Sequence, residues 1–368
     1  MVENWKSSAA ALPQGKEALT CRRETVTAAS AQGARPGPLD APGGLNYNER
    51  LSRGAPIARE AVTSISGYQV LAKLREGAQS ELYLVRDTAG RRFALKVLPQ
   101  RLAGVKSASK RLMNEGATGM RLRHSENVIR TEKVGRDEGR NFVVLEYLRG
   151  QTLRGLIRAQ GPVSERDLVA IARQSALGLS YIHEQGIVHK DVKPDNIFVT
   201  DEGVVKIIDF GIAESKVSSR FTFFRKIEGS PSYIAPELLE KARPDELSDI
   251  YAFGITLYEA ATGRLPYSAG GAQQIMNWTK DRRRKAEPPR TYAEDLSSYM
   301  DSLITKCIEK DRSARVSSFT AFYASLGRNP LMRGSATGIS TAELKKRLAA
   351  KRARGGSAGQ GGSQDAAE

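Results

Sequence analysis

The chain has 368 residues, 40% of them hydrophobic, which is enough for a sizeable core and for one to three domains. Lysine and arginine outnumber aspartate and glutamate by 57 to 41, and this net charge of +16 favours anionic partners without specifying a fold. Two cysteines are too few for a disulfide framework, and the sequence lacks a long apolar run and an apolar leader. We therefore expect a cytoplasmic protein with no transmembrane segment and no secretory signal.

Residues 1–66 come first and are rich in Ala, Gly, Ser and Pro, most of all in residues 32–44. Such a composition buries too little apolar surface to offset the entropy lost when a chain becomes ordered. We therefore expect a disordered N-terminal extension.

The folded pattern begins with two predicted strands, residues 68–74 and 81–86, whose side chains alternate between apolar and polar. The connection between them contains a single glycine, Gly77. Residues 92–98 form the next predicted strand. It is an apolar run in which Lys96 is costly to bury unless its ammonium group finds an anion.

A helix is expected over residues 109–124, with one acidic residue, Glu115, followed by Gly116 and Gly119. Each glycine costs about 1 kcal/mol relative to alanine in a helix interior, so we interpret the helix as marginal on its own. One hypothesis is that an activating partner, a homodimer or phosphorylation holds this helix in place. The alternative is a loosely packed helix that is always in place.

Two more elements precede the most informative stretch. Residues 142–150 form an apolar strand that ends at a glycine, and residues 164–185 carry apolar residues at helical spacings. The stretch 187–211 then sets polar residues between apolar runs, namely His189, Asp191, Lys193, Asn196 and Asp209. Two carboxylates and an amide brought together by a hairpin can position a hydroxyl group and hold divalent cations over a triphosphate.

The order and spacing of these residues resemble the protein-kinase signature, and the resemblance covers residues 68–326 with its motifs in the right order. A lysine two residues after Asp191 is typical of the serine/threonine kinases. The resemblance implies transfer of the γ-phosphoryl group of ATP, with Mg²⁺ or Mn²⁺, to serine or threonine hydroxyls of protein substrates.

The resemblance also implies a role for each motif residue. Asp191 accepts or orients the substrate hydroxyl, and Lys193 screens the transferring phosphoryl group. Lys96 pairs with the nucleotide phosphates and with the helix glutamate, Glu115. The implied metal ligands are Asn196 and Asp209, and the remaining implied ATP-binding residues are Leu74, Gly77, Leu82, Ala94, Leu145, Glu146, Leu148 and Phe198.

The connection over residues 75–80 departs from the family pattern. Kinases usually place three glycines in this phosphate-binding lid, whereas this chain keeps only Gly77 and has Arg75 and Ser80 in the other two places. One interpretation is a stiffer lid that still permits close approach to phosphates. The other is an ordinary hairpin turn.

Residues 214–228 are the implied activation segment, with Ser218, Ser219 and Thr222 as candidate phosphosites. A phosphate on one of them would pair with nearby basic residues and order the loop. The alternative is an unmodified loop whose phenylalanines simply pack.

Three further residues are implied to have structural roles. Glu237 closes the segment that cradles the substrate and pairs with Arg315, while Asp249 opens an apolar helix and binds the backbone of the catalytic loop. Removing one partner of a buried Arg–carboxylate pair costs about 3–5 kcal/mol.

Two basic segments lie outside these motifs. Residues 279–285 are expected to be either a solvated helix face or a docking surface for acidic substrates. In the tail, residues 327–368, a capping-box signal opens a short basic helix over residues 344–354. That helix is expected to be solvated, or to bind nucleic acid or an anionic membrane surface, and the tail is otherwise expected to be mostly disordered.

The sequence thus predicts an α+β, bilobal, protein-kinase-like fold, with a small antiparallel-sheet N-lobe over residues 67–147 and a mostly helical C-lobe over residues 148–326. The predicted function is that of a serine/threonine protein kinase, which also phosphorylates its own activation loop. Two alternatives stay open. The glycine-poor lid favours a nucleotide-binding pseudokinase that acts as a scaffold, and the substrate-cradling segment disfavours a small-molecule phosphotransferase.

Overall fold

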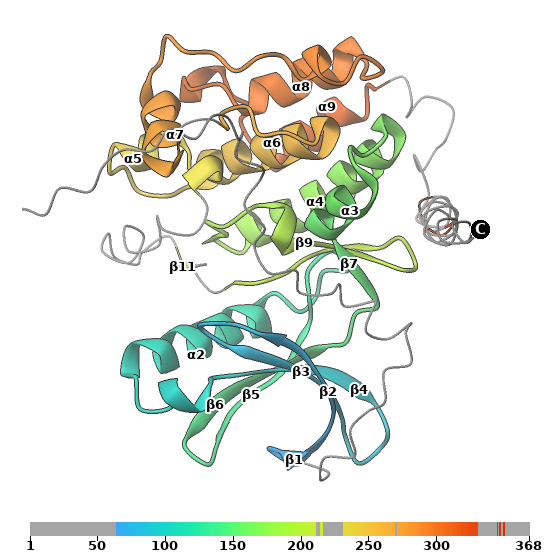
Figure 1. Ribbon diagram of the computed structural model, residues 1–368, viewed down its shortest axis with the longest axis vertical. Coiled ribbons are helices and arrows are strands. Elements are labelled where there is room, and N and C mark those ends of the chain that lie inside the picture. The colour runs from blue at the N-terminus through green and yellow to red at the C-terminus, as the bar shows by residue number, and fades with distance from the viewer. Residues whose placement is uncertain are drawn as a thin grey trace, which may run out of the picture. The chain divides into compact units, whose positions relative to one another are not determined.

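The computed structural model describes residues 64–210, 214–215, 231–268 and 271–329, together with residues 344, 346 and 349. Within these residues, an antiparallel sheet with one long helix is followed by a mostly helical part (Figure 1). The predicted α+β, bilobal fold class is confirmed, and we refer to the two parts as the N-lobe and the C-lobe.

The N-lobe is built on a six-stranded antiparallel sheet in the order β1-β2-β3-β4-β6-β5. Alternate residues of its central strands, among them Val85, Leu95 and Val144, are fully buried and form an apolar core on one face. The strands are β1 (Ser64–Ile65), β2 (Tyr68–Glu76), β3 (Glu81–Arg86), β4 (Arg92–Val97), β5 (Thr131–Asp137) and β6 (Arg140–Glu146).

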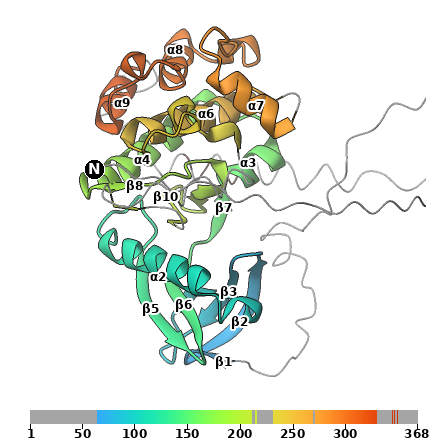
Figure 2. The ribbon, with the colours of Figure 1, turned by 90° about the vertical axis from the view of Figure 1, so that its left-hand side faces the viewer.

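The helix α2 (Lys106–Arg121), preceded by the short η1 (Gln100–Leu102), packs across β5 and β6 (Figure 1, Figure 2). Leu112 of this helix joins Val143 of the sheet in a second buried apolar cluster. This packing carries the middle of α2, and with it Glu115, over the sheet.

The C-lobe is organised around two long helices, α4 (Glu165–Glu184) and α6 (Glu246–Thr262), which pack against each other. Both begin at side-chain caps, Ser164 for α4 and Asp245 for α6, which satisfy backbone N–H groups of the first turn. All residues of α6 from Ser248 onward are buried, so this helix forms the centre of the lobe. The other helices are α3 (Leu153–Gln160), α5 (Pro236–Leu239), α7 (Gly271–Lys280), α8 (Ser298–Cys307), α9 (Phe319–Leu326), η2 (Pro194–Asn196), η4 (Pro231–Tyr233), η5 (Pro289–Thr291) and η6 (Arg312–Ala314).

Two small antiparallel sheets hold the polar stretch of the sequence. One contains β7 (Gly150–Thr152), β9 (Ile197–Thr200) and β10 (Val205–Ile207), and the other pairs β8 (Ile187–Val188) with β11 (Glu214–Ser215). Residues 189–196 therefore connect β8 to β9, and Asp209 follows β10 closely. Figure 1 shows β7 and β9 on the side of the helices that faces the N-lobe.

The described fold begins earlier and reaches further than the sequence predicted. Ser64 and Ile65, expected in the disordered extension, pair with β2, and Ile65 packs against the N-lobe core. Leu344, expected on a solvated basic helix, is helical and fully buried in the C-lobe core, because an apolar side chain gains by leaving water. Most of both extensions lies outside the described residues. Among the residues that the structure describes, no helix is long and apolar enough to cross a membrane.

Candidate active site

Lys96 lies inside β4, and its side chain is 16% exposed. Its Nζ is 2.5 Å from Oε1 of Glu115 on α2 and 3.5 Å from Oδ1 of Asp209 in the C-lobe. Burial acts to lower the pKa of the Lys96 amine, but the negative charges of Asp209 and Glu115 outweigh it and raise that pKa. The amine is therefore a fixed cation between the two lobes.

Gly116 and Gly119 bring α2 close to the sheet. A Cβ atom at Gly116 would lie 2.6 Å from Cγ2 of Val134, and one at Gly119 would lie 2.0 Å from Oγ1 of Thr131. Neither site has room for a methyl group. Interpreting the glycines only as points of weakness missed this packing role, because they permit the approach that brings Glu115 to the buried lysine.

The lid, residues 75–80, forms a tight turn between β2 and β3. The Gly77 N–H donates to the carbonyl of Ser80 at 3.0 Å, and a Cβ atom at Gly77 would lie only 2.9 Å from that same oxygen. The close backbone approach within the turn thus explains why a glycine stands at this position. Arg75 still belongs to β2, where it pairs with Leu82.

The apolar residues that the resemblance implies for ATP binding come from both lobes. Ala94 of β4 lies opposite Leu145 of β6 in the sheet, and Leu82 lies opposite Lys96. Ala94 is buried, whereas the remaining apolar members of the set are half-buried: Leu74, Leu82, Leu145, Leu148 and Phe198. Partly exposed apolar side chains from several elements are typical of the lining of a small-molecule site.

Glu146, at the end of β6, makes two contacts through its side chain. Its Oε1 accepts the N–H of Arg130 at 2.8 Å and lies 2.8 Å from Nζ of Lys206 on β10. The side chains of Glu146 and Lys206 are 17% and 12% exposed, so this ion pair between the lobes is largely shielded from water. The sequence implied only a role in ATP binding for Glu146, and its contact with Lys206 was not predicted.

The loop between β8 and β9 brings three of the predicted residues together. Nζ of Lys193 lies 2.9 Å from each carboxylate oxygen of Asp191. Nδ2 of Asn196 donates to Oδ2 of Asp191 at 3.0 Å and to its backbone carbonyl at 2.8 Å. Because Asn196 donates through its nitrogen, its amide oxygen is the atom that can ligate a cation.

Asp249, near the start of α6, holds this loop in an unfavourable backbone conformation. Lys190, in this loop, has a φ of 68°, in the left-handed region that residues with side chains rarely adopt. The Asp249 carboxylate accepts the N–H of Lys190 at 2.8 Å and the N–H of His189 at 2.7 Å, and it lies 2.9 Å from Nε2 of His183. Burial acts to raise the pKa of Asp249, but these hydrogen bonds and the two histidines outweigh it and lower that pKa.

A buried polar network beside the catalytic loop was not predicted. Arg154 of α3 donates to Glu259 of α6, to the Tyr233 hydroxyl of η4 at 2.5 Å and to Asp195 of the loop at 3.2 Å. Tyr233 in turn donates to Glu259. Burial and the charge of Glu259 raise the pKa of the Tyr233 phenol, which keeps it a donor. The available signal was a glutamate inside the apolar run of α6, which needs a buried partner.

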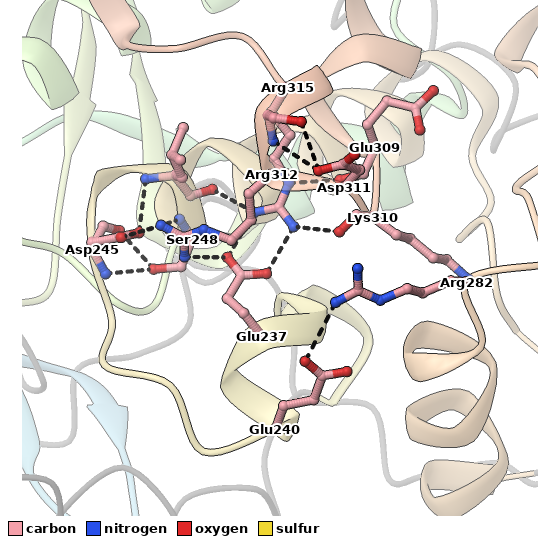
Figure 3. Close-up of polar contacts among 12 residues, drawn as sticks. Glu237, Glu240, Asp245, Ser248, Arg282, Glu309, Lys310, Asp311, Arg312 and Arg315 are labelled. Carbon is pink, nitrogen blue, oxygen red and sulfur yellow. Dashed lines mark hydrogen bonds and ion pairs between the residues drawn. The ribbon is translucent and has the colours of Figure 1, made fainter.

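Glu237 is held by two arginines (Figure 3). Arg315 makes a two-point contact in which Nη1 and Nη2 each lie 2.7 Å from one carboxylate oxygen. Arg312, which was not predicted, lies 3.3 Å from Oε1 of Glu237 and also contacts Asp245, the cap of α6. The two arginines therefore fasten the segment after η4 to the start of α6.

Two arginines of the basic run at the end of α7, residues 279–285, contact neighbouring side chains. Arg282 lies 3.6 Å from Glu240 (Figure 3), and the guanidinium of Arg284 lies 3.9 Å from the centre of the Trp278 ring. Residues 282–285 are all exposed, so both the solvated face and the docking surface stay predictions.

Of the implied activation segment, residues 214–228, the structure describes only β11. The candidate phosphosites Ser218, Ser219 and Thr222 lie outside the described residues.

This combination of a two-lobed fold, a lysine–glutamate pair in the N-lobe and a polar loop in the C-lobe defines a protein kinase. The family model for the protein kinase domain matches residues 68–325. The chain belongs to the protein kinase family.

Curated relatives carry serine/threonine-protein kinase names. The chain is 34% identical over 244 residues to a probable serine/threonine-protein kinase of Clostridium acetobutylicum, and this alignment covers 66% of this chain and 37% of that protein. It is 32% identical over 264 residues to the serine/threonine-protein kinase PknL of Mycobacterium tuberculosis, and this alignment covers 71% of this chain and 65% of that protein. It is 30% identical over 249 residues to PrkC of Bacillus subtilis, with 67% of this chain and 38% of that protein covered. The match thus spans less than two thirds of each of these relatives.

Proposed function

We propose that the chain is an ATP-dependent protein kinase that transfers the γ-phosphoryl group to serine and threonine hydroxyls of proteins. The single observation that carries the proposal is the position of Lys96, 2.5 Å from Glu115 and 3.5 Å from Asp209. A mostly buried cation that joins both lobes is placed for anionic phosphates between them, and membership of the kinase family supports the same activity.

The residues present fit ATP with a divalent metal. Among the described residues, no group of three His, Cys, Asp or Glu side chains could hold a metal ion by itself. Mg²⁺ usually takes one or two protein oxygen ligands and completes its shell with water and substrate phosphates. The amide oxygen of Asn196 and the carboxylate of Asp209, whose side chain is 39% exposed, suit that pattern. We propose Mg²⁺ as the metal, with Mn²⁺ as a substitute.

When bound, ATP supplies the phosphoryl group and the metal neutralises phosphate charge, while residues of this chain orient the reacting groups. Asp191 orients the substrate hydroxyl and takes its proton, while Lys193, 2.9 Å from Asp191, stabilises negative charge that develops near the transferring group. Lys96 binds phosphate oxygens, and Glu115 keeps its amine in place. Asp249 positions Asp191 through the backbone of His189 and Lys190.

The proposal extends to organisation and substrates. We propose a kinase domain over residues 67–326, with Ser64–Ile65 and Leu344 added to its folded part. The structural residues Glu237, Asp249 and Arg315 hold its substrate-cradling segment and catalytic loop. Protein substrates include the chain's own activation segment, at Ser218, Ser219 or Thr222. The proposed location is the cytoplasm.

The test is transfer of label from γ-labelled ATP to a generic protein substrate and to the chain itself. Wild type, Asp191→Ala and the matched control Glu202→Ala, an exposed acidic residue between β9 and β10, are compared. Wild type and the control should incorporate label, and Asp191→Ala should lose at least about a thousandfold in rate. Mapping the label after incubation with ATP identifies any site between residues 215 and 230.

Equal label with wild type and Asp191→Ala would mean that a contaminating kinase does the work. No label with any of the three, together with measurable nucleotide binding, would support the pseudokinase scaffold instead. Label in the protein substrate but none in residues 215–230 would reject autophosphorylation there and leave transfer to other proteins intact.

A further inference from the structure

The lid is held from outside by two arginines that the kinase signature does not include. Nη2 of Arg101, in η1, donates to the carbonyl of Ala78 at 2.9 Å and to that of Gly77 at 3.2 Å. Nη1 of Arg111, on α2, donates to Oε1 of Gln79 at 2.6 Å. We refer to Arg101 and Arg111 as the arginine clamp.

The base of the lid is fastened as well. Nζ of Lys73, on β2, lies 3.0 Å from Glu76 and 3.1 Å from Glu81, which are the last residue of β2 and the first of β3. Inside the turn, Gly77 donates to Ser80. The hairpin is therefore closed below its tip by a lysine and at its tip by a backbone hydrogen bond. What the clamp adds is the direction in which the tip points.

Arg111 and Glu115 lie four residues apart on the same helix, about one turn of α2. Arg111 contacts the lid, and Glu115 contacts Lys96. A movement of α2 away from the sheet would thus pull on two elements of the phosphate site at once. The sequence alone did not indicate this, because Gln79 and Arg111 are far apart in the chain and belong to no short motif.

We propose that the arginine clamp positions the lid over the nucleotide phosphates and that Arg111, its member on α2, couples nucleotide binding to the position of this helix. This inference rests on the proposed function, since it assigns positioning residues to the same site. A glycine-rich lid adapts to phosphates through its own freedom, whereas this lid has one glycine and is oriented from outside. Holding the tip in place lowers the ordering cost of nucleotide binding.

Coupling of this kind acts in both directions. If α2 in its observed position favours a lid that binds phosphates, bound nucleotide must stabilise α2 in that position by the same factor. The contacts are exposed and each is a single hydrogen bond with a charged donor, so the effect is modest: we expect about a three- to tenfold change in nucleotide affinity.

The main experiment measures the affinity of the full chain for Mg·ADP by calorimetry. Arg111→Ala, Gln79→Ala and the double variant are compared with wild type and with Lys110→Ala, an exposed neighbour on α2 that makes no described contact with the lid. Arg111→Ala and Gln79→Ala should each weaken Mg·ADP binding about three- to tenfold. The double variant should bind no more weakly than the worse single variant, because both changes remove the same contact. Lys110→Ala should match wild type.

The second measurement is hydrogen exchange of the backbone amides of α2, with and without Mg·ADP. Nucleotide should slow exchange in α2 of wild type and Lys110→Ala, and should do so less in Arg111→Ala. Arg101→Ala removes the contacts to two lid carbonyls and should weaken the binding of Mg·ADP. It should not reduce the nucleotide-induced protection of α2, since Arg101 lies outside that helix. Unfolding midpoints of all variants verify that they fold.

Unchanged Mg·ADP affinity in folded Arg111→Ala and Gln79→Ala would overturn the proposal. Tighter binding would overturn it as well, because it would mean that nucleotide must break the contact between Arg111 and Gln79 in order to bind. Additive losses in the double variant would overturn the coupling through this contact. These results are separable from the proposed function, because a chain that binds Mg·ADP but transfers no phosphoryl group would fail the latter and still test the clamp.

Discussion

Replacing Gly119 by alanine sets helix propensity against packing. On propensity alone, alanine would stabilise α2 by about 1 kcal/mol. In the structure, the added Cβ would lie 2.0 Å from Oγ1 of Thr131, a residue of β5 that is 2% exposed and has little room to move. Overpacking of this kind costs about 1–3 kcal/mol, and the severity of the overlap places it near the upper limit. We therefore expect Gly119→Ala to lower the free energy of unfolding by about 2 kcal/mol.

The assay is urea unfolding of wild type, Gly119→Ala, Thr131→Ala and the double variant, with the change read from the midpoint at constant slope. Removing the Thr131 hydroxyl leaves its Cβ, 3.0 Å from the added methyl, as the nearest atom, so the cost of Gly119→Ala should largely disappear in that background. Phosphoryl transfer should fall with Gly119→Ala, because α2 is pushed away and Glu115 with it. A more stable Gly119→Ala would refute the packing argument and restore the interpretation of the glycine as a point of weakness.

Four further substitutions test the polar contacts. Asp249→Asn should lower the free energy of unfolding by about 3 kcal/mol at neutral pH. The folded-state pKa of Asp249 lies below its unfolded value of about 3.9, so the stabilisation is complete above that pH and is lost as the pH falls through the folded-state value. The difference in unfolding free energy between the variant and wild type should therefore disappear in acid. Arg154→Met leaves Glu259 buried without its cation and should lower the free energy of unfolding by about 3 kcal/mol, measured by urea unfolding; an unchanged free energy of unfolding would contradict the importance of this pair. Arg315→Met should cost about 3–5 kcal/mol in thermal or urea unfolding, whereas Arg312→Met, at a side chain 36% exposed, should cost about 1 kcal/mol or less. Equal costs for the two arginines would show that burial does not decide the strength of these pairs.

The fold class followed from the sequence because it depends on local patterns. Apolar and polar residues alternate along the strands of the N-lobe, and the long helices carry apolar residues at regular spacing. In the catalytic stretch, Lys193 and Asn196 follow Asp191 within five residues. Lys96 stood out because a lysine inside an apolar strand needs an anion.

What the sequence could not supply were contacts between residues that are far apart in the chain. Arg154 and Glu259 lie on different helices, Glu146 and Lys206 in different lobes, and no spacing rule connects either pair. Gly119 was misinterpreted for the same reason. Helix propensity describes the chain near this residue, whereas its role is set by Thr131 on a neighbouring strand.

The burial of Leu344 has a practical consequence for anyone who shortens this chain. The family match ends at residue 325, and a fragment cut there would lose a leucine that fills the C-lobe core. Burying such a side chain contributes about 1.5–3 kcal/mol, a sizeable share of the stability of an ordinary domain. A truncated preparation that aggregates would then reflect an uncovered apolar surface, and a boundary placed after residue 349 is the better choice for expression and crystallisation.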